Sequence, residues 1–143
     1  MDLAFAEARA AAARGEVPVG AVVTDADGTV LAAAGNRVEE LHDACAHAEL
    51  LALRAAAALR GEPRLPDCTL HVTLEPCPLC AAAASLFRVK RVRFGAYDPK
   101  GGGVEHGPRV FSAPGALHKP EVVGGIREAE AAALLRAFFA PLR

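Results

Sequence analysis

Two short segments of the sequence contain residue types that could bind a metal ion and move protons. The first contains His47 and Glu49, and the second contains Cys77 and Cys80 with two residues between them. One imidazole and two thiolates can hold a zinc ion while leaving its fourth position open for water, as in catalytic zinc sites. A carboxylate that is not itself a ligand could then carry protons. These four residues therefore predict a hydrolytic zinc site.

The spacing of these residues predicts how they are positioned. Cys77 and Cys80 are three residues apart at the start of an expected helix, so their sulfur atoms should lie on one face. Free N–H groups and the helix dipole favour thiolate over thiol in such a first turn. His47 also starts an expected helix, so two neighbouring helix starts could aim their ligands at one point. Glu49 is only two residues from His47, which places it beside the metal and outside the ligand set.

These residue types also have other common uses in proteins. A Cys-x-x-Cys pair alone is often redox-active or structural, and a lone helical histidine is commonly a core residue. A closed structural zinc site would need four ligands, and Cys45 could supply the fourth. Against this alternative, a single residue separates Cys45 from His47, which is tighter than the usual ligand spacing, and Glu49 would have no role. We therefore expect an open site.

The composition is that of one globular domain. The chain has 143 residues, of which 52% are hydrophobic, and a formal net charge of -1, which argues against disorder. No run of 18 apolar residues is present, so no membrane span is expected. Charged residues interrupt the N-terminal stretch, where a secretory signal would need a continuous apolar segment. We expect a single domain over residues 1–143, located in the cytoplasm, with cysteines available for metal binding or thiol chemistry.

Hydrophobic periodicity and turn residues predict alternating helices and strands. Helices are expected over residues 2–14, 46–60, 77–87 and 126–139, and strands over residues 17–23, 29–34, 69–74, 89–95 and 121–123. The first two strands should form a hairpin, whereas residues 35–44 and 97–119 are expected to be irregular. This order predicts an α/β fold of three layers, α/β/α, in which helices cover both faces of a mixed five-stranded sheet.

At these residues the chain resembles the cytidine and deoxycytidylate deaminase superfamily, whose known signature is His-x-Glu followed by Pro-Cys-x-x-Cys. Residues 17–23, 36–37, 46–49, 73–77 and 95–100 are also similar to motifs of the bacterial tRNA-specific adenosine deaminases. That family converts the wobble adenosine of an arginine tRNA to inosine. The resemblance covers nearly the whole chain. It implies a homodimer of cytidine-deaminase-like fold with one zinc ion (Zn²⁺) per subunit and a tRNA anticodon stem-loop as the partner.

The resemblance also implies roles for individual residues. His47, Cys77 and Cys80 match the zinc ligands, and Glu49 matches the proton shuttle. Zinc-bound hydroxide would attack C6 of adenine, while Glu49 would protonate N1 and then the departing ammonia. The residues that match contacts to the target nucleotide are Asn36, Ala48 and Asp98.

Several positions depart from that family and bear on the substrate. The loop beginning Gly-Gly-Gly-Val-Glu-His-Gly (residues 101–107) is a variant, and the chain ends Phe-Phe-Ala-Pro-Leu-Arg where the family generally has a basic tail. RNA affinity comes largely from lysine and arginine contacts to phosphates, so we expect weaker tRNA binding than in relatives with the tail. The basic run that remains is Arg88, Lys90, Arg91, Arg93 and Lys100. Aromatic residues that could stack on unpaired bases are Phe111, Phe138 and Phe139.

Three functions are compatible with these observations. The leading interpretation is a tRNA wobble adenosine deaminase, which Asn36 and the motif at residues 95–100 favour. The main alternative is a deaminase of a free base, nucleoside or nucleotide of the guanine, cytosine or cytidine type. A small substrate needs no basic surface, which suits the net charge of -1. The third is a non-catalytic zinc-stabilised module, for which Glu49 is the discriminating residue. Without the resemblance, Asn36 would be a turn residue and Asp98 a loop cap.

Overall fold

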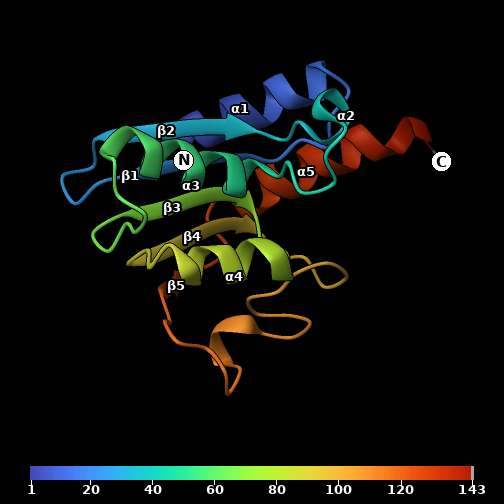
Figure 1. Ribbon diagram of the computed structural model, residues 1–143. Coiled ribbons are helices and arrows are strands. Elements are labelled where there is room, and N and C mark those ends of the chain that lie inside the picture. Colours follow the sequence, from blue (N-terminus) through green and yellow to red (C-terminus); the bar gives the residue numbers. More distant parts are fainter. Residues whose placement is uncertain (143) are drawn as a thin grey trace.

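A five-stranded mixed sheet lies at the centre of the structure (Figure 1). The computed structural model describes residues 1–142, with side chains up to residue 141. In spatial order the strands are β2 (Val30–Gly35), β1 (Gly20–Thr24), β3 (Thr69–Leu74), β4 (Arg91–Ala96) and β5 (Glu121–Val123). β1 is antiparallel to both β2 and β3, whereas β3, β4 and β5 are parallel. The predicted hairpin and the predicted mixed sheet are both present.

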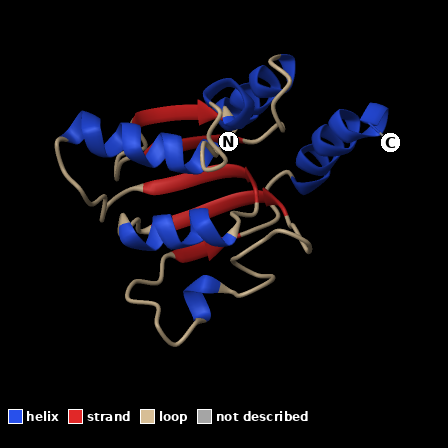
Figure 2. Ribbon diagram, turned by 45° about the vertical axis from the view of Figure 1, so that its right-hand side comes forward, coloured by secondary structure: helices blue, strands red, loops and turns tan. Residues whose placement is uncertain are grey.

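Helices cover both faces of this sheet, which confirms the predicted α/β/α layers. α3 (Ala48–Arg60) and α4 (Pro78–Leu86) lie on one face, and α1 (Asp2–Ala13) and α5 (Glu128–Phe139) lie on the other (Figures 1 and 2). Side chains alternate between the faces of a strand, so every second residue points toward α3 and α4. The main core on that face includes Ala21, Val23, Leu70, Val72, Val92 and Phe94.

On the opposite face of the sheet, glycine residues in the strands allow α1 and α5 to pack closely against the sheet. A Cβ added at Gly20 would lie 1.9 Å from the carbonyl oxygen of Ala4 in α1, and one at Gly95 would lie 3.0 Å from Cβ of Ala131 in α5. Only glycine fits at the backbone approach of Gly20, and a Cβ at Gly95 would make a contact tighter than ordinary packing. These contacts bring α1 and α5 to the half of the sheet that contains the ends of β3 and β4.

Two predicted segments differ from the structure. The expected strand at residues 17–23 begins only at Gly20, and residues 35–44 contain the one-turn helix α2 (Val38–Leu41). The buried Glu16 carboxylate accepts the backbone N–H groups of Glu39 and Glu40 at 3.1 and 2.9 Å. A carboxylate at the start of a helix satisfies N–H groups that have no partner within the helix. Because Glu16 is more than twenty residues away, the local sequence does not reveal this turn.

The long connection over residues 97–119 is largely irregular, as predicted. It contains one short 3₁₀ helix, η1 (Val110–Ser112), and a second one, η2 (Ala140–Leu142), follows α5. Phe111 of η1 is only 6% exposed and packs into the main core. The connection is therefore anchored against the α3 and α4 face. Among residues 1–142, we find no helix that is both long and apolar enough to cross a membrane.

Candidate active site

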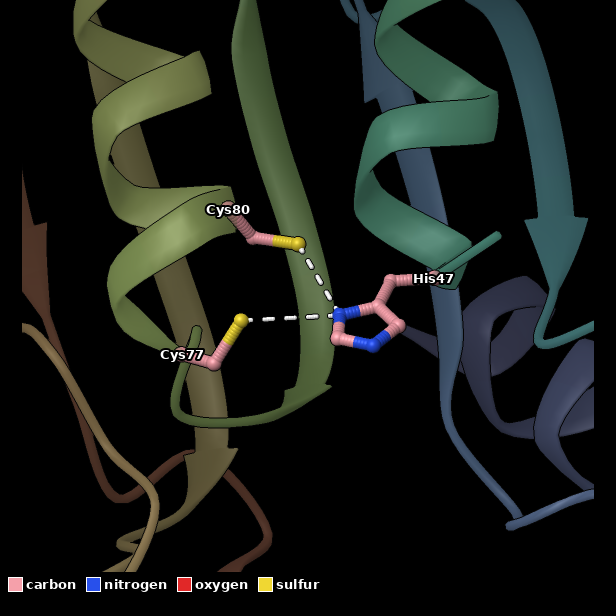
Figure 3. A group of neighbouring side chains, drawn as sticks. All are labelled: His47, Cys77 and Cys80. Atoms are coloured by element: carbon pink, nitrogen blue, oxygen red, sulfur yellow. Dashed lines mark hydrogen bonds between the residues drawn. The ribbon is translucent and has the colours of Figure 1, made fainter. Parts of the chain in front are cut away.

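Three predicted metal ligands meet where α3 and α4 begin. His47 is the N-cap residue of α3, Cys77 is the N-cap residue of α4, and Cys80 lies in the first turn of α4. The side chains point toward one another across the gap between the two helix starts (Figure 3). His47 Nδ1 lies 3.5 Å from Cys77 Sγ and 3.4 Å from Cys80 Sγ. The three ligand atoms all lie within 4.8 Å of one another.

These distances fit a zinc ion shared by the three side chains. Zinc bonds of about 2.3 Å to sulfur and about 2.0–2.1 Å to nitrogen, at a tetrahedral angle, separate the nitrogen and sulfur atoms by about 3.6 Å. The observed separations of 3.5 and 3.4 Å are close to that value. Two sulfurs and one imidazole are also donors that zinc prefers. The protein therefore has a zinc site with one position left for water or substrate.

Cys45 does not join this group. Among the residues that the structure describes, the ligand cluster consists of His47, Cys77 and Cys80 alone. Cys45 is exposed, and its backbone N–H donates to Asp43 Oδ1 at 2.9 Å in the turn before α3. A closed four-ligand structural site is therefore not formed.

The electrostatics of the site favour thiolate at Cys77. The Cys80 thiol hydrogen-bonds to Cys77 and lowers the pKa of Cys77 to about 4, with further help from His47. The same hydrogen bond and burial raise the pKa of Cys80. The Cys77 side chain also raises the pKa of His47. The pair thus shares one proton, and a bound metal cation would favour loss of that proton because the thiolate is the metal ligand.

Glu49 lies in the first turn of α3 and is only 4% exposed. Burial raises its pKa to about 7, and the negative charge of Cys77 acts in the same direction. A carboxyl group with a pKa near the working pH can both accept and donate a proton. Glu49 lines the same cavity as His47 and Cys77 without joining the ligand cluster. This is the placement that its spacing from His47 predicts.

A cavity of about 300 Å³ opens beside two of the predicted ligands, His47 and Cys77. Asn36 lines it, and its Oδ1 accepts the backbone N–H of Ala48 at 2.8 Å. The Ala48 N–H is thus already bonded, whereas no hydrogen bond among the described residues uses the Asn36 side-chain NH₂ group. The residues around this cavity are Val17, Val19, Asn36, Val38, Glu39, His47, Glu49, Leu74, Glu75, Cys77, Asp98 and Gly101.

Asp98 also lines the cavity, and its carboxylate shapes the loop that contains it. Oδ1 accepts the backbone N–H groups of Lys100 and Gly101 at 3.2 and 2.9 Å. An aspartate that bonds its own backbone two or three residues on is a common turn element. Asp98 thus lines the cavity and also caps its own loop, as the sequence without the resemblance would suggest.

Sequence reasoning missed Glu75, which lies two residues before Cys77. Glu75 lines the cavity but its side chain is fully buried, and backbone N–H groups and His106 lower its pKa despite the opposing effect of burial. The signal available in the sequence was a charged residue at the end of an apolar strand. Charged residues in such positions are seldom buried unless they are paired.

The predicted basic run is not gathered at this cavity. Lys90, Arg91 and Arg93 line a separate polar cavity of about 580 Å³ near the start of β3 and β4, whereas the zinc ligands lie beyond the other end of β3. Arg91 is paired there with Glu121 at 2.9 Å. Within this basic run, Lys100 lies in the loop beside the zinc cavity, where its backbone N–H donates to Asp98 Oδ1. The start and the end of a strand lie on opposite sides of the sheet. A run of basic residues in the sequence does not reveal which of these sides contains the zinc site.

Comparison with known proteins bears on this site. The family described as "Cytidine and deoxycytidylate deaminase zinc-binding region" matches residues 1–96. A tRNA-specific adenosine deaminase of Agrobacterium fabrum is 52% identical over 139 residues, which cover 97% of this chain and 91% of that protein. Both matched ranges include the two segments that form the site.

Solved structures give a similar result. One, from a study of A-to-I editing by tRNA:A34 deaminases at the wobble position, has a TM-score of 0.92 and 52% identity, and covers 94% of this chain and 97% of that chain. Guanine deaminase from Nitrosomonas europaea has a TM-score of 0.78 and 26% identity, and covers 97% of this chain and 82% of that chain. A tRNA:A34 deaminase and a guanine deaminase both act on purines.

Proposed function

Because the chain belongs to the cytidine and deoxycytidylate deaminase family, and within it to the tRNA-specific adenosine deaminases, we propose that it deaminates the wobble adenosine of a tRNA to inosine. The proposed substrate is the anticodon stem-loop of an arginine-type tRNA. The proposal also includes the single deaminase domain over residues 1–143 and a cytoplasmic location, where tRNA is found. Cell fractionation tests the location.

The proposed residue roles follow the geometry of the cavity. His47, Cys77 and Cys80 would hold zinc, which supplies activation of water at neutral pH. Glu49 would move one proton to N1 of adenine and another to the departing amino group, since its pKa lies near 7. The Asn36 NH₂ group would donate to an acceptor of the base.

One observation supports a nucleotide within RNA over a free base. The zinc cavity adjoins a groove of about 280 Å³, and the two share Val17, Leu74 and Asp98. The groove continues to Tyr97 and Phe139, which are 39% and 38% exposed. Exposed aromatic rings can stack on unpaired bases next to the target. A single base would leave this groove unused.

The decisive assay uses the zinc-loaded protein and a stem-loop with an ACG anticodon. We expect inosine at the wobble position and no deamination of free adenosine, cytidine, cytosine or guanine under the same conditions. A matched stem-loop with a GCG anticodon controls for background hydrolysis. Turnover of a free base without turnover of the stem-loop would refute the tRNA function.

A deaminase of a free purine is the second candidate. The likeness to a guanine deaminase over 97% of this chain favours it, as does the net charge of -1. The free-guanine arm of the assay tests it directly. Against it stands the much higher identity, 52%, to a tRNA-specific adenosine deaminase.

We also propose that tRNA binding is weaker than in relatives with a basic tail. Lys90, Arg91 and Arg93 line the distant polar cavity, and Phe111 is buried in the core, so neither group serves the zinc cavity. Phe138 contacts Phe139 edge to face, with ring centres 5.2 Å apart, and Phe139 lines the groove that adjoins the zinc cavity. Filter binding at matched salt tests this proposal, and an affinity equal to that of tailed relatives would contradict it.

A homodimer is part of the proposal. The face of α4 and the neighbouring connection presents Leu79, Leu86 and Leu117, which are 42%, 70% and 83% exposed. Leu86 and Leu117 also line an apolar cavity of about 280 Å³. Such clustered apolar side chains are typical of an interface. We expect light scattering to give a dimer that Leu86→Glu converts to monomer, whereas Val30→Glu on β2 does not; a monomeric wild type would contradict this.

A further inference from the structure

The Glu75 carboxylate binds both ends of one loop. Oε1 accepts the backbone N–H of Asp98 at 3.0 Å and lies 2.8 Å from His106 Nδ1. Oε2 accepts the backbone N–H groups of Val104, Glu105 and His106 at 3.2, 2.9 and 3.1 Å. Hydrogen bonds to an ionised acceptor are roughly twice as strong as neutral ones. Residues 98–106, which we call the pinned loop, are thus held by a single buried group.

The glycines of the pinned loop allow this close approach. A Cβ at Gly102 would lie 2.4 Å from Glu75 Oε2, and a Cβ at Gly103 would lie 2.6 Å from the backbone nitrogen of Pro78. The Gly103 N–H donates to the carbonyl oxygen of Pro76 at 2.8 Å. The variant Gly-Gly-Gly sequence therefore wraps around the carboxylate and presses on the start of α4, next to Cys77.

The pinned loop also forms one wall of the zinc cavity. Asp98 and Gly101 line that cavity together with His47, Glu49 and Cys77. Glu75 is therefore linked to two parts of the site: the wall on which the substrate would rest and the backbone that supports one zinc ligand. Its own carboxylate is occupied by the hydrogen bonds of the loop, so it is not free to act on a substrate.

We propose that Glu75 is a positioning residue for the deamination reaction, acting by fixing the pinned loop against the start of α4. The proposed effect of Glu75 on catalysis rests on the proposed function, whereas its effect on the position of the pinned loop does not. Loss of the carboxylate would release the loop and shift Cys77 and Asp98 together. A displacement of about 1 Å in a positioning element can lower the rate roughly 10²-fold.

The test compares Glu75→Gln with Glu105→Gln in the full-length, zinc-loaded protein. Both remove one negative charge from the same region, but Glu105 is exposed, whereas the Glu75 carboxylate is buried and accepts the N–H groups of the loop. We expect the N–H groups of residues 98, 104 and 106 to exchange with deuterium at least tenfold faster in Glu75→Gln only. With Co²⁺ in place of zinc, the thiolate-to-cobalt absorption bands should shift in Glu75→Gln only. The value of kcat/KM for the stem-loop should fall roughly 10²-fold.

A second pair of variants covers the case in which Glu75→Gln does not fold. Gly102→Ala places a methyl group against both the Glu75 carboxylate and the backbone carbonyl oxygen of Asp98, whereas a methyl group at Gly115 would meet nothing within 4 Å. The first should reproduce the faster exchange and the slower turnover, and the second should not. Unchanged exchange in Glu75→Gln and Gly102→Ala would show that Glu75 does not hold the loop. Faster exchange with kcat/KM within twofold of wild type would show that the loop position does not matter for catalysis.

These readouts separate two kinds of failure. If wild-type protein does not deaminate the stem-loop, the proposed function is wrong, yet the exchange rates and the cobalt spectrum still decide whether Glu75 holds the loop and Cys77. If wild type is active, the comparison with Glu105→Gln decides the role in catalysis.

Discussion

The Asn36 side chain accepts the backbone N–H of Ala48 at 2.8 Å, which ties the turn after β2 to the first turn of α3. Because Ala48 lies between His47 and Glu49, this bond fixes the segment that contains a zinc ligand and the proposed proton shuttle. It also orients the Asn36 amide, with its oxygen toward the helix and its NH₂ left as a donor at the cavity.

This relationship predicts the behaviour of an Asn36→Asp variant. Aspartate keeps an acceptor for the Ala48 N–H but loses the NH₂ donors and adds a charge near Glu49. We expect bound zinc and thermal stability close to wild type, with kcat/KM for the stem-loop reduced at least tenfold. Metal analysis, a melting curve and stem-loop kinetics check these outcomes. Wild-type kinetics in Asn36→Asp would exclude a donor role for Asn36.

Glu49→Gln tests the proton shuttle. The amide matches the shape of the buried carboxyl group but cannot carry the proton, so turnover should fall 10²-fold or more while zinc content stays unchanged. Glu39→Gln, at an exposed position on the same cavity, removes the same charge and should stay within a few-fold of wild type. Equal turnover in Glu49→Gln and wild type would rule out Glu49 as the proton shuttle.

Cysteine variants test the metal site. Cys80→Ser should lose most of its zinc and all measurable turnover, because thiolate ligands supply much of the affinity. Cys45→Ser should retain one zinc per chain, since Cys45 stands outside the ligand cluster. Elemental analysis after dialysis against a chelator distinguishes them. Zinc loss in Cys45→Ser would instead revive the closed four-ligand site.

The environment of His71 leads to a prediction of how the free energy of unfolding depends on pH. Its Nε2 lies 3.0 Å from Thr24 Oγ1 and its Nδ1 lies 3.3 Å from an Arg93 nitrogen. Burial, with smaller effects from the N-terminal amino group, Arg93 and Arg91, lowers the pKa of His71 to about 4. Above about pH 6.5, His71 is neutral in both the folded and unfolded chain and has no effect. As pH falls toward 4, only the unfolded chain gains the proton, so the folded protein loses stability.

A His71→Gln variant should lack this part of the acid destabilisation. The upper limit from linkage is about 3 kcal/mol between pH 6.5 and 4, and partial solvation should reduce it to about 1–2 kcal/mol. Urea unfolding at several pH values gives the difference between variant and wild type. The exposed His42→Asn variant is the control and should parallel wild type. A His71→Gln profile parallel to wild type would show that the partly buried His71 does not stay neutral in the folded protein.

The order of helices and strands and the zinc ligand set were predictable because both depend on local patterns. Hydrophobic periodicity and turn residues act within a few neighbours, and the helix starts at His47 and Cys77 follow from them. The exceptions depend on distant partners. The turn of α2 forms because Glu16 reaches it from another part of the chain.

The sequence by itself determined which side chains can bind zinc, the order of the main helices and strands, and that Glu49 stands outside the ligand set. Only the tertiary structure decided that Lys90 and Arg93 lie at the far end of the sheet, that Phe111 is in the core, and that Glu75 holds the pinned loop. The physical reason is that these placements depend on strand order and on hydrogen bonds between residues about thirty positions apart. Neither is encoded in the spacing of neighbouring residues.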